Sequence, residues 1–190
     1  MSINFTARQV SSTTIQHRLP FRNYTQSDVS IVELDRCNYS DMDALHDAAY
    51  KWENNGAKYA RAIYNKAESG GYYHDILKDH YYALTTQNAD FRKLRPDMIL
   101  GLMVFSETKN PENEILYLEV NPSTSKSLNR IREYKQVGRK LVDFVHSKFK
   151  KKDIFIQSDR DAIKFYKKMG CEQPSKAPEK VCQLYLRALK

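Results

Sequence analysis

Two hydrophobic periods alternate along this chain. Apolar, β-branched and aromatic residues gather in short runs that end at polar, glycine or proline positions, and such runs predict β-strands. The predicted strands cover residues 29–35, 80–86, 98–107, 114–120, 153–157 and 181–189. Residues 1–28 are rich in Ser, Thr, Gln, Asn and Arg, so we interpret them as an extended or flexible N-terminal arm.

Between these runs, apolar residues recur at helical spacing. In residues 40–55 the spacing follows Ser40, and Asp43 stands three positions later, which predicts that Ser40 caps a helix. The other predicted helices cover residues 57–68, 137–149 and 160–170. The helix over 137–149 has the clearest apolar stripe.

The order of these elements indicates how they are connected. The three strands between residues 80 and 120 are joined by short or polar links, which favours an antiparallel meander. The strand, helix and strand between 115 and 157 form a crossover unit, which places the N-terminus of a helix beside the end of a strand.

Composition adds bounds on the protein class. A chain of 190 residues with 41% hydrophobic residues fits one folded domain. It contains no apolar run long enough for a membrane span and no secretory signal, so we expect a cytoplasmic protein that does not bind membranes. Its three cysteines are too few and too irregularly spaced for a disulfide framework. The net charge of +8 favours an anionic partner without identifying it.

The sequence around residue 138 combines several features that favour phosphate binding. A predicted strand (114–120) leads into a basic loop with Gly138 and then into the best predicted helix. Free amide groups at a helix N-terminus attract phosphate, and a glycine lets the backbone approach it closely. An ordinary helix start is the alternative interpretation of the same residues.

Three motifs in order resemble those of the Gcn5-related N-acetyltransferases (GNAT). They are LEVNP (118–122), KQVGRKLVDFV (135–145) and DAIKFYKKMG (161–170), and the resemblance covers about residues 115 to 172. Val120 and Pro122 match the turn after the family's fourth strand, and Tyr166 matches the family's helix tyrosine. In the loop, Glu133 replaces Gln or Arg, and Gln136 replaces the first glycine.

The resemblance implies a fold, a donor and a set of ligands. It implies a mixed α/β (α+β) domain over residues 29–190, with a largely antiparallel twisted sheet and helices on both faces. It implies acetyl-CoA as co-substrate, with its arm paired to a bulged strand that diverges from the next one. The donor-binding residues it suggests are Leu118, Val120, Arg132, Lys135, Gln136, Val137, Gly138, Arg139, Lys140 and Asp159.

The candidate catalytic residues are Tyr166, which the resemblance suggests, and Glu119, which we choose for its place on the strand beside the donor-pairing residues. Tyr166 would be the general acid that protonates the departing coenzyme A thiolate, and the alternative is a core tyrosine. An amine acceptor is mostly protonated at neutral pH and needs a base, for which Glu119 is our candidate. An exposed structural glutamate is the alternative there, and Glu112 and Glu114 are weaker candidates for the base.

Other interpretations rank lower. His74 and His80 do not have the spacing of a helical metal-ligand pair, so we expect no metal. A nucleophile pair of Cys37 and His46 has no supporting signature. An inactive GNAT-fold module that binds nucleic acid or another anionic partner through its basic and aromatic residues is the alternative function. The sequence does not identify the amine acceptor, and it is compatible with a monomer or a homodimer.

Overall fold

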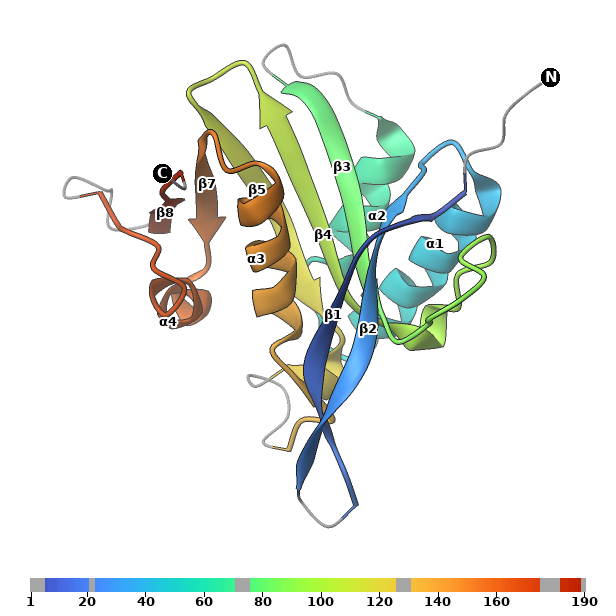
Figure 1. The fold of residues 1–190 in the computed structure, drawn as a ribbon. Helices are drawn as coiled ribbons and strands as arrows, with labels where there is room; N and C mark the ends of the chain where they lie inside the picture. Colours follow the sequence, from blue (N-terminus) through green and yellow to red (C-terminus); the bar gives the residue numbers. More distant parts are fainter. Residues whose placement is uncertain (1–5, 21–22, 71–75, 126–130, 175–181, 189–190) are drawn as a thin grey trace.

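The computed structural model describes residues 6–20, 23–70, 76–125, 131–174 and 182–188. Within these residues one sheet has the strand order β6-β1-β2-β3-β4-β5-β7-β8 (Figure 1). The strands are β1 (Arg8–Arg18), β2 (Tyr24–Leu34), β3 (Ile76–Thr85), β4 (Ile99–Thr108), β5 (Glu112–Val120), β6 (Tyr134–Lys135), β7 (Asp153–Ser158) and β8 (Cys182–Leu186). β5 and β7 are parallel, and the other neighbouring strands are antiparallel.

Helices cover both faces of this sheet. They are α1 (Tyr39–Glu53), α2 (Ala60–Ser69), α3 (Val137–Lys148) and α4 (Ile163–Lys167). The mixed, largely antiparallel sheet with helices on both faces confirms the predicted fold class.

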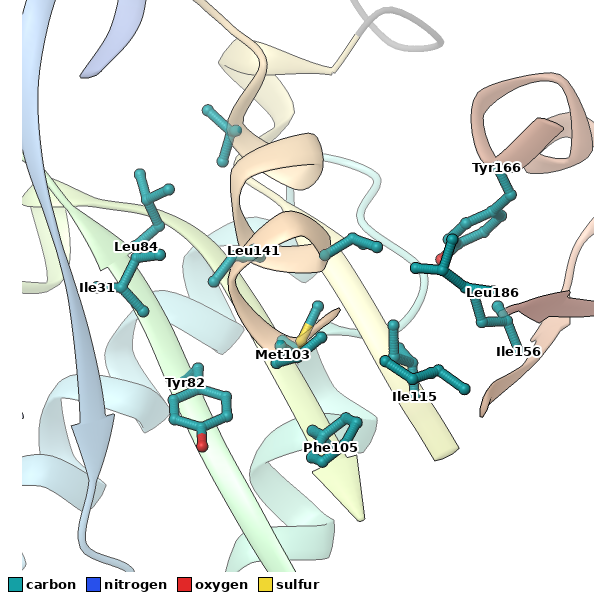
Figure 2. Packing of buried hydrophobic residues seen from close by; sticks show 14 of the residues in the cluster. Ile31, Tyr82, Leu84, Met103, Phe105, Ile115, Leu141, Ile156, Tyr166 and Leu186 are labelled. Carbon is teal, nitrogen blue, oxygen red and sulfur yellow. The ribbon is translucent and has the colours of Figure 1, made fainter. Parts of the chain in front are cut away.

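The side-chain alternation of the strands gives the protein two apolar cores. Tyr82 and Met103 are fully buried in the core beneath α3, whereas their neighbours along the strands face the core beneath α1 and α2. Figure 2 shows Leu141 of α3 beside Leu84 and Met103 of the sheet. Trp52 anchors α1 in the second core, where it is 1% exposed. The sheet is therefore buried on both faces, which fixes the position of each strand.

The N-terminal region differs from the expectation of an extended or flexible arm before residue 29. Residues 8–18 form β1, which pairs with β2 over its whole length, and β2 begins at Tyr24 rather than at residue 29. A boundary at residue 28 would fall inside β2. Ile15 explains why the arm belongs to the sheet, because its side chain is completely buried in the core beneath α3.

The start of α1 also differs from the prediction. Asn38, not Ser40, is the N-cap, because its backbone is extended and its side chain accepts a hydrogen bond from the Asp41 amide at 3.2 Å. Ser40 lies inside the helix. In the described part of the chain, no helix has both the length and the apolar character needed to cross a membrane.

Candidate active site

The parallel strands β5 and β7 are paired along only part of their length. Their register runs from Glu112 opposite Asp153 to Ile115 opposite Ile156, and no pairing follows in the described residues. β5 continues to Val120 while β7 continues to Ser158. The edge of β5 beyond Ile115 therefore presents backbone amide and carbonyl groups that β7 does not use.

A bulge in β5 marks the point of divergence. Val104 of β4 is opposite Tyr117, but Phe105 is opposite Ile115, so Leu116 is the extra residue. A bulge bends its strand and increases the local twist, which carries the end of β5 away from β7. The bulge and the divergence both agree with the geometry that the resemblance implied.

The N-terminus of α3 lies beside the open edge of β5. Its N-cap, Gln136, has a left-handed backbone (φ 72°), and its side chain makes no capping hydrogen bond. The first intrahelical bond in this region joins the Lys140 amide to the Gln136 carbonyl at 2.9 Å. The amides at the start of α3 are therefore suited to an anion. The left-handed conformation explains why the family motif has glycine at this place.

Two glycines allow this helix to approach the sheet. A Cβ atom on Gly101 of β4 would lie 2.7 Å from Val137 Cγ1 and 3.0 Å from Leu141 Cδ1, so only glycine fits without a shift. A Cβ atom on Gly138 would instead lie 3.5 Å from Val120 Cγ1 and 3.7 Å from Leu118 Cδ2, which is ordinary contact. Gly101 is thus a packing requirement, whereas a methyl group at Gly138 would make ordinary contacts with the end of β5 and with Phe165 of α4.

The predicted donor-binding residues fall into different environments. Leu118 and Val120 pack against the core beneath α3, and Val137 is buried. Arg139 is exposed and lies 3.5 Å from Asp143 in an ion pair along the helix. Lys140, Gln136 and Gly138 lie in the first turn of α3 or at its cap. Arg132 and Lys135 are instead held by the β1–β2 hairpin: the Arg132 carbonyl accepts from Tyr24, and the Lys135 ammonium lies over the Tyr24 ring.

Asp159 directly follows β7, on the β7 side of the opening between the unpaired ends of β5 and β7. Its carboxylate is 3.3 Å from Lys58 Nζ, and hydrogen bonding from the Tyr59 hydroxyl, followed by the effect of Lys58, lowers its pKa. Lys58 and Tyr59 belong to the connection between α1 and α2. The three residues therefore link that connection to the segment after β7. The role of Asp159 in binding the donor stays a prediction.

Glu119 points to the face of β5 opposite Leu118 and Val120. Its carboxylate accepts a hydrogen bond from the Tyr59 amide at 2.9 Å, so it stabilises the start of α2. Burial raises its pKa, although hydrogen bonds from Tyr59, Val120 and Lys58 amides oppose that effect. A partly buried carboxylate of raised pKa is a stronger base than an exposed one.

Tyr166 extends from α4 toward the part of the core that holds Leu186 and Ile156 (Figure 2). It is 6% exposed, and burial raises its pKa, with further contributions from Cys171, Glu119 and Tyr59. The phenol therefore stays protonated at neutral pH, and the raised pKa makes it a weaker acid than a free tyrosine. Glu119, Tyr59 and Tyr166 come together from β5, the α1–α2 connection and α4.

The comparisons with known proteins place this geometry in a fold family. No protein-family model matches the sequence, and no curated protein matches it. A solved structure assigned as an N-acetyltransferase from Lactobacillus plantarum has a TM-score of 0.53 at 12% identity, over 85% of this chain and 99% of that one. The ribosomal-protein-S18-alanine N-acetyltransferase from Escherichia coli gives 0.51 at 14% identity, over 84% and 94%. A structure assigned as an acyl-CoA N-acyltransferase from Klebsiella pneumoniae gives 0.51 at 10%, over 85% and 98%.

The chain has the GNAT fold. In that fold β5 and β7 are the diverging strands, and α3 and α4 are the helices that follow β5 and β7 along the chain. Identities of 10–14% extend this likeness to the fold alone.

The structure also shows which residues the sequence patterns missed. The sequence did not indicate a role for Lys58 and Tyr59, because both lie in a segment that was predicted only as part of a helix. Their partner, Asp159, lies about a hundred positions further along the chain. Gly101 could have been found, since an isolated glycine inside a strand indicates close approach of another backbone or side chain. Among the described residues, no group of three or more His, Cys, Asp or Glu side chains is arranged to hold a metal ion. His74 lies outside those residues.

Proposed function

We propose that this chain transfers an acetyl group from acetyl-CoA directly to a primary amine, without a covalent enzyme intermediate. The observation that carries the proposal is the divergence of β5 from β7 after Ile115, next to the N-terminus of α3. The N-acetyltransferase assignments of proteins with the same fold support it, at low identity. An anionic donor would also account for the two basic residues in the first turn of α3, Arg139 and Lys140.

The residues at the opening fit an acyl-CoA donor. The free edge of β5 over Leu118–Val120 would pair with the amides of the pantetheine arm as an additional strand would. The amides at the start of α3 would bind the diphosphate, and Lys140 and Arg139 would add positive charge. Gly138 has no side chain, so the donor could approach the backbone closely at the start of α3, beside Val120 and Leu118.

The acceptor would approach from the face of β5 that carries Glu119. Glu119 takes a proton from the ammonium group, directly or through a water, and the amine nitrogen then attacks the thioester carbonyl carbon. A C–N bond forms and the C–S bond breaks, while backbone amides polarise the carbonyl oxygen. Tyr166 donates its proton to the departing sulfur and regains one from solvent. Because Glu119 is acidic and the rings of Tyr59 and Tyr117 flank the same face, a cationic amine is the expected acceptor.

The test is calorimetric titration with acetyl-CoA, followed by an acceptor screen that measures released thiol. We expect stoichiometric binding and thiol release that depends on an added amine. Absence of acetyl-CoA binding would refute the proposal. Salt-dependent binding of nucleic acid without any acetyl-CoA affinity would favour the alternative of an inactive anion-binding module.

A further inference from the structure

The β1–β2 hairpin contacts the segment that leads into α3. β6 is part of this segment and pairs with β1, with Gln16 opposite Lys135 and His17 opposite Tyr134. Figure 1 shows that the hairpin extends past the neighbouring strands toward this end of α3. The segment Arg132–Lys135 directly precedes Gln136, the cap of the proposed diphosphate-binding helix. We call Arg132–Lys135 the lead-in segment.

Hydrogen bonds hold the backbone of the lead-in segment at two further points. The Arg18 amide donates to the Glu133 carbonyl at 2.7 Å. The Tyr24 hydroxyl donates to the Arg132 carbonyl at 3.1 Å, in a partly buried position. The hairpin therefore fixes successive carbonyl groups of the lead-in segment from two different strands.

Ring contacts fix the side chains of the same segment. The imidazole of His17 stacks on Tyr134, with centroids 4.5 Å apart and planes 15° apart. The Lys135 ammonium lies 3.3 Å from the centroid of the Tyr24 ring. Tyr24 thus serves the lead-in segment twice, through its hydroxyl group and through its ring. The charge of Lys135 is directed toward the hairpin rather than toward the first turn of α3.

The seam between hairpin and loop is not a packed apolar layer. A hollow of about 520 Å³ opens beside it, lined on the hairpin side by His17, Arg18, Leu19 and Pro20, and on the loop side by Ser123, Ile131 and Glu133. The lead-in segment is therefore held by the contacts of Tyr24, His17 and Arg18, by the hydrogen bond from the Glu133 amide to the Ser123 carbonyl at 3.2 Å, and by the packing of Tyr134 against the core beneath α3. Removing one of these contacts should move the segment without removing a piece of the core.

From these contacts we infer that Tyr24 is a positioning residue for the binding of the donor's diphosphate. Gln136 holds a left-handed backbone that disfavours residues with a side chain, so neighbouring contacts must impose it. The hairpin supplies such contacts to the residues that precede Gln136. This loop has Gln136 where the family motif has its first glycine. The inference rests on the proposed function, because it assumes that the amides after Gln136 bind a diphosphate.

Two variants of Tyr24 and one control separate positioning from general stability. Tyr24→Phe removes the hydrogen bond to Arg132 and keeps the ring under Lys135, whereas Tyr24→Leu removes both contacts. Thr14→Ala is the matched control, because Thr14 is an exposed residue of the same hairpin that pairs with β2. Each protein is titrated with coenzyme A, and amide hydrogen exchange is measured over residues 132–140.

Tyr24→Phe should raise the Kd for coenzyme A roughly three- to tenfold, and Tyr24→Leu should raise it further, with faster exchange over residues 134–139. Thr14→Ala should match the wild type in both measurements. An unchanged Kd in Tyr24→Leu would overturn the inference, as would unchanged exchange in that segment. If the wild type itself does not bind coenzyme A, the proposed function fails, and exchange alone decides whether the hairpin positions the loop.

Discussion

The substitution Gly138→Ala separates folding from donor binding at the start of α3. A Cβ atom there would lie 3.5 Å from Phe165 Cζ and from Val120 Cγ1, so the fold accepts a methyl group without displacement. Gly138 is the second residue of the helix and has no left-handed backbone. Alanine restricts the unfolded chain and favours the helix, so we expect the free energy of unfolding to rise by about 0.5–1 kcal/mol.

The same methyl group should weaken donor binding. It would stand at the start of α3 beside Leu118 and Val120, where we propose that the donor meets the backbone amides. Introducing a methyl group into a tight contact costs about 1–3 kcal/mol, which corresponds to a rise in Kd of roughly five- to 150-fold. Urea denaturation gives the stability, and calorimetric titration with coenzyme A gives the Kd.

A matched control is Ser147→Ala, which makes an exposed position near the other end of α3 a better helix former. It should stabilise the protein slightly and leave the Kd unchanged. A Gly138→Ala protein that binds coenzyme A as tightly as the wild type would refute the proposed path of the donor. A loss of stability greater than about 1 kcal/mol would instead refute the packing at this helix start.

Three further substitutions test other parts of the account. Gly101→Ala places a methyl group 2.7 Å from Val137 Cγ1 and should lower the free energy of unfolding by about 1–3 kcal/mol in urea denaturation; an unchanged stability would contradict this packing. Tyr166→Phe should lower kcat roughly 100-fold and leave the Kd for acetyl-CoA unchanged in calorimetry, and equal turnover would remove its assigned role. Glu33 has a pKa of about 2, lowered from 4.5 chiefly by its hydrogen bond with His80. Its folded pKa lies below its unfolded one, so its stabilisation is complete above pH 4.5 and is lost as the pH falls toward 2, by as much as roughly 3 kcal/mol. Glu33→Gln should make unfolding less pH-dependent in that window, and a slope equal to that of the wild type would contradict the assignment.

The elements with strong periodicity could be predicted from the sequence. The stripe over 137–149 predicted α3 within a residue at each end, and the apolar run over 98–107 predicted β4. Local hydrophobic patterns were sufficient there, because α3 buries one face in the core beneath it and β4 buries both of its faces in the two cores. The ordered motifs likewise identified the fold, because they lie on β5, which is one of the two diverging strands, and on the helices α3 and α4.

The N-terminal hairpin could not be predicted from the same kind of pattern. β1 is mostly polar, with Val10 and Ile15 as its apolar residues, so it resembles an arm. Its place in the sheet is set by pairing with β2 on one side and with β6, which follows more than a hundred positions later, on the other. Contacts between distant segments leave no local signal in a single sequence.

Only part of the candidate site could be predicted, because some of its contacts also join segments that are distant in the sequence. Motif matching gave Tyr166 and Gly138, and strand alternation gave the direction of Glu119. The contact of Glu119 with Tyr59, and the link from Tyr59 to Asp159, depend on the connection between α1 and α2 folding over the end of β5. Tertiary structure alone brings these groups together.

The central claim is that the donor lies along the open edge of β5 with its diphosphate at the start of α3. Amide chemical shifts of the isotope-labelled protein, recorded during titration with coenzyme A, test this claim most directly. We predict saturable shifts that are largest over residues 116–120 and 136–139. Saturation with the largest shifts elsewhere, or no shifts at millimolar coenzyme A, would contradict it.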